Sequence, residues 1–361
     1  MLMRRIVATA LSALLLAAGP ATADTFASKE RVVTPLAPGV YAIRHKDATP
    51  DWPNGNTLIV IGEREVLVVD SCVLPSAARE DIAQIRQWTD KPVRWLVNTH
   101  WHIDHNAGNR AYLDAFPGLA IVAQRATKAM MDEYNPGVPA RFVAAYRKQV
   151  DAKQKSLDAG TGENGRPLSA EASAALADDI AALGDFVAEY QEFRYQSPTL
   201  AIERSIAIDL GGRGVEVRFL GRGHTLGDVV VQLPAEKIVA TGDLLAHPVP
   251  YMLGGFPREW IETLDALGKL GATTFVPGHG EVLRGTAYLA EVRELLESAT
   301  RQVHAEIARK GSAATLEAVQ KVVDLKAFRT RMAGDDPVAA EFFDESAASL
   351  IRNVYYEAKQ R

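Results

Sequence analysis

The stretch that decides the fold is Val93-Arg94-Trp95-Leu96-Val97-Asn98-Thr99-His100-Trp101-His102-Ile103-Asp104-His105. Its first five residues are apolar except for one arginine, which predicts a buried strand. Three of the eight histidines in the chain then follow within six residues. Because positions i and i+2 point apart on a helix, this cluster is predicted to lie in a loop at the end of the strand.

A loop of this composition favours a metal site. His100 and His102 could converge on one metal ion, and Asp104 and His105 on a neighbouring ion. The alternative is a solvated polar turn, which the density of ligand-type side chains disfavours. A catalytic zinc usually takes three protein groups and keeps one position for water, so further ligands are expected elsewhere in the chain.

Three later segments offer those ligands, each beside glycine and each at the end of a predicted strand. They are Gly223-His224-Thr225, Thr241-Gly242-Asp243 and Pro277-Gly278-His279-Gly280. Glycine lets the backbone approach a metal closely. Taken singly, each segment could equally be an ordinary polar turn, but together with the first cluster they predict a complete metal site.

These motifs resemble the metallo-β-lactamase superfamily in order, spacing and context, over roughly Val40 to Val282 without the region 126–196. The resemblance implies an α/β fold, an αββα sandwich of two mixed β-sheets with outer helices and the site at one edge. It also implies the ligands. His100, His102 and His224 would bind one metal, Asp104, His105 and His279 the other, with Asp243 bridging both and Asp70 shaping the loop from outside.

The expected cofactor is two Zn²⁺ per chain, because five imidazoles and two carboxylates without a thiolate suit zinc; iron and manganese stay open. Di-iron relatives of this fold typically have Glu where this chain has His102. We expect a metal-bridging hydroxide to attack an acyl carbonyl, with Asp104 as the catalytic residue that orients it and relays its proton. His247, Tyr251 and Trp101 are weaker candidates for substrate contacts.

The residue at position 243 narrows the range of expected substrates. True zinc β-lactamases have Cys or Ser there, whereas Asp243 resembles glyoxalase II, lactonases and alkylsulfatases. We therefore expect an ester, lactone, thioester or related small molecule. A periplasmic β-lactamase is the main alternative. An iron-dependent redox enzyme and a non-catalytic metal-stabilised binding protein are the others.

The amino terminus predicts export. Met1 to Arg5 is basic, Ile6 to Ala18 is nearly continuously apolar, and Ala21-Thr22-Ala23 is a cleavage pattern, so residues 1–23 read as a signal peptide. The mature chain would begin near Asp24 in the periplasm or outside the cell, with no membrane attachment. A net charge of -5 without a basic face makes nucleic acid an improbable partner, and the oligomeric state stays open.

The remaining pattern predicts the organisation of the chain. We expect the superfamily domain over 24–300, a helical insertion at 126–196 that covers or buttresses the site, and a C-terminal helical extension over 301–361 packed on the domain. Strands are expected at 39–44, 57–61, 65–70, 93–97, 119–122, 202–210, 215–220, 228–233, 238–241 and 273–276, and helices at 75–89, 106–116, 170–190 and 260–270. Cys72, the single cysteine, is expected to be half-buried rather than a nucleophile or ligand, and it excludes an intrachain disulfide.

Overall fold

A computed structural model describes residues 28–49, 52–162 and 165–360, so the expected signal peptide lies outside the described residues. Seven strands form one mixed sheet in chain order: β1 (Val32–Ala37), β2 (Val40–Arg44), β3 (Thr57–Ile61), β4 (Val66–Val69), β5 (Val93–Val97), β6 (Ala120–Gln124) and β7 (Leu200–Ile202). Strands β1 to β4 pair antiparallel, and β4 to β7 pair parallel.

Within the described part of the chain, six strands form the second sheet, in the order β13-β12-β11-β10-β9-β8. They are β8 (Ser205–Asp209), β9 (Gly214–Phe219), β10 (Val229–Leu233), β11 (Ile238–Gly242), β12 (Thr274–Pro277) and β13 (Leu283–Arg284). Only β11 and β12 pair parallel, whereas the other pairs are antiparallel. Both sheets are therefore mixed, as expected.

Strand β4 shows why these sheets stack. Leu67 and Val69 belong to the core between the two sheets, and Val66 and Val68 to the core under the outer helices. Alternate residues of a strand point to opposite faces, so a strand buried on both faces must be apolar throughout. The helices α1 (Pro75–Trp88) and α2 (Asn109–Ala115) cover this outer face of the first sheet.

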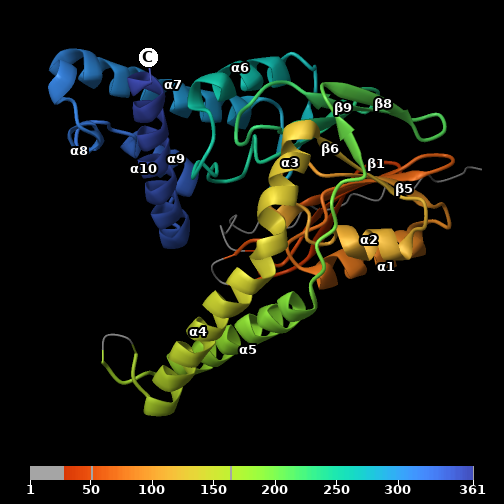
Figure 1. Ribbon diagram of the computed structural model, residues 1–361, viewed down its shortest axis with the longest axis horizontal. Coiled ribbons are helices and arrows are strands. Elements are labelled where there is room, and N and C mark those ends of the chain that lie inside the picture. The colour runs from red at the N-terminus through yellow and green to blue at the C-terminus, as the bar shows by residue number, and fades with distance from the viewer. Residues whose placement is uncertain (1–27, 50–51, 163–164, 361) are drawn as a thin grey trace, which may run out of the picture.

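The outer face of the second sheet is covered by helices from the C-terminal part of the chain. Val230, Val239 and Phe275 share one core with them. These helices are α6 (Pro257–Gly268), α7 (Ala287–Lys310), α8 (Leu316–Gln320), α9 (Lys326–Ala333) and α10 (Pro337–Lys359). The predicted αββα sandwich is confirmed, with α7 continuing across residue 300 (Figure 1).

The region between β6 and β7 is helical, as predicted. It contains α3 (Arg125–Tyr134), α4 (Val138–Ala159) and α5 (Ala170–Glu192), and α4 and α5 pair as an extended hairpin that projects from the sandwich (Figure 1). Phe142, Phe186 and Tyr190 form an aromatic core near its base with Val73 and Ile103. The insertion is thus anchored beside the loops that carry the histidines. None of the described helices is long and apolar enough to cross a membrane.

Several local predictions were wrong. The single strand expected over 202–210 is divided between the two sheets: β7 ends at Ile202, and β8 starts at Ser205. The polar run Glu203-Arg204-Ser205 interrupts the apolar alternation here, but such a break does not show that the chain crosses to the other sheet. The helix expected from residue 106 begins at Asn109, after a 3-10 turn over Ile103–His105. Cys72 is fully buried rather than half-buried.

Candidate metal centre

The loop after β5 carries four of the seven predicted ligands. It closes with the 3-10 turn Ile103–His105, which redirects the chain immediately after His102. His100 and His102 consequently fall into one group of side chains, and Asp104 and His105 into another. One loop therefore contributes to two adjacent groups, as the spacing of its residues suggests.

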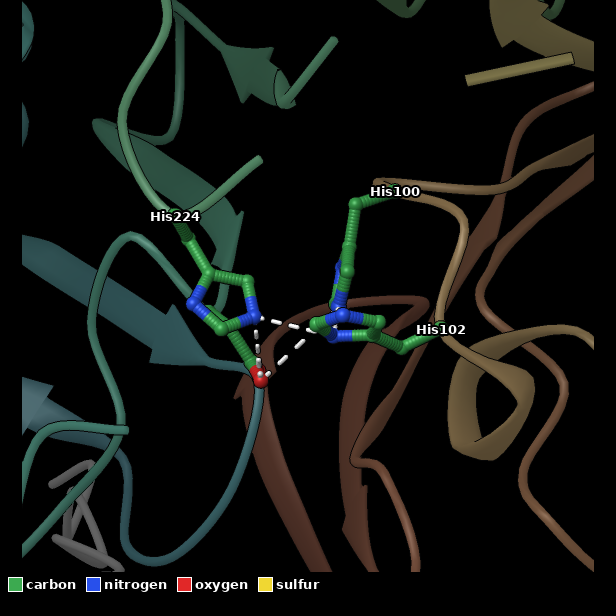
Figure 2. Close-up of side chains that lie close together, drawn as sticks. His100, His102 and His224 are labelled. Atoms are coloured by element: carbon green, nitrogen blue, oxygen red, sulfur yellow. Dashed lines mark hydrogen bonds and ion pairs between the residues drawn. The ribbon is translucent and has the colours of Figure 1, made fainter. Parts of the chain in front are cut away.

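Three imidazoles converge in the first group (Figure 2). Nδ1 of His102 lies 3.1 Å from Nε2 of His100 and 3.0 Å from Nε2 of His224, which follows β9. Two of these side chains, His100 and His224, are almost completely buried. The predicted first set of ligands is thus brought together from two sheets.

The second group joins the same loop to the end of β12. Nε2 of His105 lies 3.2 Å from Nε2 of His279. Oδ2 of Asp104 lies 3.1 Å from Nε2 of His279 and 3.5 Å from Nε2 of His105. The side chains of Asp104 and His279 are 13% and 14% exposed, whereas His105 is closed off, so solvent reaches the centre from this side.

Asp243 lies between the two groups, at the end of β11. Its Oδ2 is 3.5 Å from Nε2 of His224 and 3.8 Å from Nε2 of His100. Its Oδ1 is 3.3 Å from Nε2 of His105 and 3.6 Å from Nε2 of His279. One carboxylate thus presents a different oxygen to each group.

The donor atoms fit metal ions. Ligands of a tetrahedral zinc ion with bonds of 2.0–2.1 Å lie about 3.3 Å apart, close to the nitrogen separations in both groups. Oδ1 of Asp243 is buried and accepts no hydrogen bond from any residue that the structure describes. At Gly278 a Cβ atom would lie 1.8 Å from that oxygen, so the backbone leaves room for the carboxylate.

Hydrogen bonds outside the two groups fix the orientation of the rings. Nδ1 of His105 donates to Asp70 at 2.9 Å, Nδ1 of His279 to the carbonyl of Asn54 at 3.0 Å, and Nδ1 of His224 to the carbonyl of Tyr251 at 3.1 Å. Each acceptor places the proton on Nδ1, which leaves the lone pair of Nε2 facing the centre. Asp70 therefore occupies the position expected for it.

The charges differ between the two groups. Burial, followed by repulsion from neighbouring imidazoles, holds the pKa of His100 well below its usual value and lowers the pKa of His102 to about 3. Burial alone would lower the pKa of His105, but nearby carboxylates, Asp243 first, raise that pKa well above 6.5. The imidazoles counteract the effect of burial on Asp104 and hold its pKa well below 3.8. His100 and His102 are thus neutral. In the second group the carboxylates stabilise the protonated form of His105, and a metal ion bound there would take the place of that proton.

Sequence reasoning missed three residues that hold the loops. Asp228 accepts hydrogen bonds from the backbone of Gly223 and Thr225, on either side of His224. The side chain of Asn54 accepts from the backbone of Val73. Asn56 donates to the carbonyls on both sides of His279, those of Pro277 and Gly280. The available signals were weak: Asp228 stands four residues after His224, and Asn54 and Asn56 flank a glycine, Gly55.

The three weaker candidates for substrate contacts lie in two different environments. Trp101 and Tyr251 flank the first group, with ring centroids 4.4 Å and 6.4 Å from that of His102. The ring of His247 instead packs on Tyr288 at 5.0 Å, and its backbone N–H donates to the carbonyl of His279. Two of the three thus border the centre through their side chains, and His247 supports it through its backbone.

Comparison with known proteins identifies the family of this chain. The metallo-beta-lactamase superfamily matches residues 50–279, more than half of the chain, and the chain belongs to that superfamily. A linear primary-alkylsulfatase from Pseudomonas sp. (strain ATCC 19151) is 24% identical over 310 residues, 80% of this chain and 53% of that protein. The chain thus spans about half the length of that relative.

Two solved structures share the fold. A metallo-beta-lactamase from Pontibacter korlensis superposes with a TM-score of 0.53 at 20% identity, covering 74% of this chain and 99% of that one. A stereoselective inverting sec-alkylsulfatase from Pseudomonas sp. superposes with a TM-score of 0.60 at 18% identity, covering 91% of this chain and 50% of that one. At these identities the likeness is one of fold.

Proposed function

We propose that this chain is a binuclear zinc hydrolase that cleaves an acyl bond of a small molecule, an ester, lactone or thioester. The observation that carries the proposal is the position of Asp243, whose Oδ2 faces His100 and His224 while Oδ1 faces His105. A carboxylate shared in this way suits two neighbouring metal ions.

Bound zinc ions would lower the pKa of a shared water toward neutrality and so supply a hydroxide nucleophile. The protein contributes orientation and proton transfer. Asp104 is ionised, partly exposed and on the solvent side of the centre, so its carboxylate can accept the proton of the nucleophile and pass it to the leaving group. Trp101 and Tyr251 would hold the apolar part of the substrate beside His102.

A second candidate is hydrolysis of sulfate esters. Two alkylsulfatases are similar to this chain over 80% and 91% of its length, which includes more than the sandwich alone. The fit to the metallo-beta-lactamase structure covers less of the chain, 74%. Hydrolysis of β-lactams is the third candidate function, and the carboxylate at position 243 disfavours it.

A substrate panel tests the proposal. Protein reconstituted with zinc is assayed with an aryl ester, a lactone, a thioester, a linear alkyl sulfate and nitrocefin, and metal content is measured by elemental analysis. We expect turnover of an acyl substrate, lowered roughly 10²–10⁴-fold in Asp104→Asn. Preferential turnover of the alkyl sulfate or of nitrocefin would overturn the proposed acyl substrate and assign the preferred compound's class instead. Activity in iron-loaded, zinc-free protein would overturn the assignment of zinc.

We also propose that the chain is exported, with a small-molecule substrate as its partner. The support is the basic and apolar pattern of residues 1–23, which lie outside the described part of the structure. Amino-terminal sequencing of protein purified from periplasmic extract should find Asp24 or a neighbouring residue first. An intact Met1 would contradict cleavage.

A further inference from the structure

A second cluster of metal-binding side chains lies outside the centre described above. His45 follows β2, Cys72 follows β4, and Asp81 is on α1, and ligand atoms from the three lie within 4.8 Å of one another. Nε2 of His45 is 3.2 Å from Oδ2 of Asp81. All three side chains are buried, at 2%, 0% and 0% exposure.

The hydrogen bonds of this cluster are incomplete. Oδ2 of Asp81 and Nδ1 of His45 have no hydrogen-bond partner among the described residues, and neither does the hydroxyl of Tyr112, which is fully buried. Burial, and then the charges of Asp81 and Cys72, raise the pKa of this tyrosine well above 10. Buried polar atoms without partners are uncommon and call for an ion or a water.

We propose that His45, Cys72 and Asp81 bind a third divalent transition-metal ion, of the zinc class, separate from the binuclear centre. A thiolate, an imidazole and a carboxylate form a donor set that zinc accepts. A bound ion would take the sulfur of Cys72 as a thiolate and would share the carboxylate of Asp81 with Arg31. The hydroxyl of Thr57 borders the cluster as a fourth group, 3.2 Å from Nε2 of His45 and 3.6 Å from Sγ of Cys72.

Such an ion would link three segments that support the loop after β5, which carries His100 to His105. The carbonyl of Cys72 accepts a hydrogen bond from the backbone N–H of Ala107, and Ser71 donates from its backbone to the carbonyl of His105. Arg31 already pairs with the other oxygen of Asp81, at 2.8 Å. Since the chain has one cysteine, a metal ion here would take the structural place that a disulfide has in other exported proteins.

The single cysteine makes the test specific. Metal-free protein is titrated with Co²⁺ while absorption is followed in the near-ultraviolet, where charge transfer from a thiolate to cobalt is seen. The seven side chains of the binuclear centre include no thiolate, so this band can arise only at Cys72. We expect three cobalt equivalents and a thiolate band in the full chain.

Three variants distinguish the outcomes. Cys72→Ser should bind two equivalents without the band and keep hydrolytic activity toward whichever substrate the wild type turns over. Asp81→Asn and His45→Gln keep the thiol, and each should weaken the band-forming equivalent roughly tenfold or more. Two equivalents and no band in the wild type would overturn the proposal, as would a band of equal affinity in the Asp81 and His45 variants. None of these readouts depends on the proposed acyl hydrolysis.

Discussion

The hydrogen bonds of Asp70 give the sharpest test of how the centre is held. Its carboxylate is buried and accepts three hydrogen bonds, from the backbone N–H of Thr99 at 2.8 Å, from the Thr99 hydroxyl at 2.8 Å and from Nδ1 of His105 at 2.9 Å. In Asp70→Asn one oxygen remains for the backbone N–H of Thr99, but the new amide group replaces Oδ2 and faces both the Thr99 hydroxyl and His105. The imidazole must then accept at Nδ1, which moves its proton to Nε2, the atom that faces His279.

The expected cost follows from these bonds. Two hydrogen bonds to Oδ2 are disturbed, and loss of a hydrogen bond to a carboxylate costs about 1.5–3 kcal/mol of folding free energy each. A metal ion at the second group must also displace the relocated proton, so its affinity should fall roughly 10–100-fold, which is about 1.4–2.7 kcal/mol of binding free energy. The first group contacts Asp70 only through Thr99, so its affinity should change much less.

Competition with a chromophoric chelator measures the two metal affinities, and urea unfolding measures stability. Asp228→Asn is the matched variant, because Asp228 is equally buried and holds the backbone around His224 in the first group. It should weaken the first metal rather than the second. Equal loss of both metals in both variants, or wild-type affinities in Asp70→Asn, would refute the assignment of Asp70 to His105.

Three further outcomes follow from local contacts. Gly278→Ala should abolish binding of both metals, because the new Cβ would lie 1.8 Å from Oδ1 of Asp243. The control Gly184→Ala places a methyl group in open space on α5 and should raise the melting temperature. Normal metal content in Gly278→Ala would contradict the first expectation. Burial raises the pKa of Asp47 to about 6, so ionising this carboxyl costs stability as pH rises from 3.8 through 6. In urea unfolding, Asp47→Asn should gain about 3 kcal/mol at pH 7.5 and close to nothing at about pH 3. Tyr190→Phe removes a buried hydrogen bond to the carbonyl of Val73 and should lower the free energy of unfolding by about 1 kcal/mol in urea unfolding. An unchanged urea midpoint would show that this hydrogen bond does not anchor the insertion.

Much of the sandwich could be predicted because its strands carry their own signal. Residues 66–69 are apolar throughout, as a strand buried on both faces must be, and the structure contains β4 there. Strand β1 lacked such a signal, since it is a partly exposed edge strand that contains Pro35. The division of residues 202–210 between two sheets was also hidden, because strand pairing is a long-range choice that apolar alternation does not record.

The sequence by itself determined which side chains could hold metals, because ligand residues beside glycine at strand ends form short, local patterns. Only the tertiary structure decided how they group: that the two oxygens of Asp243 face different sets of histidines, and that Asp70 and Asp228 each support one set. It alone placed Cys72, which reads locally as a packing residue, beside His45 and Asp81. The physical reason is that such contacts join residues far apart in the chain, and their geometry is set by how the two sheets and α1 pack rather than by any neighbour in sequence.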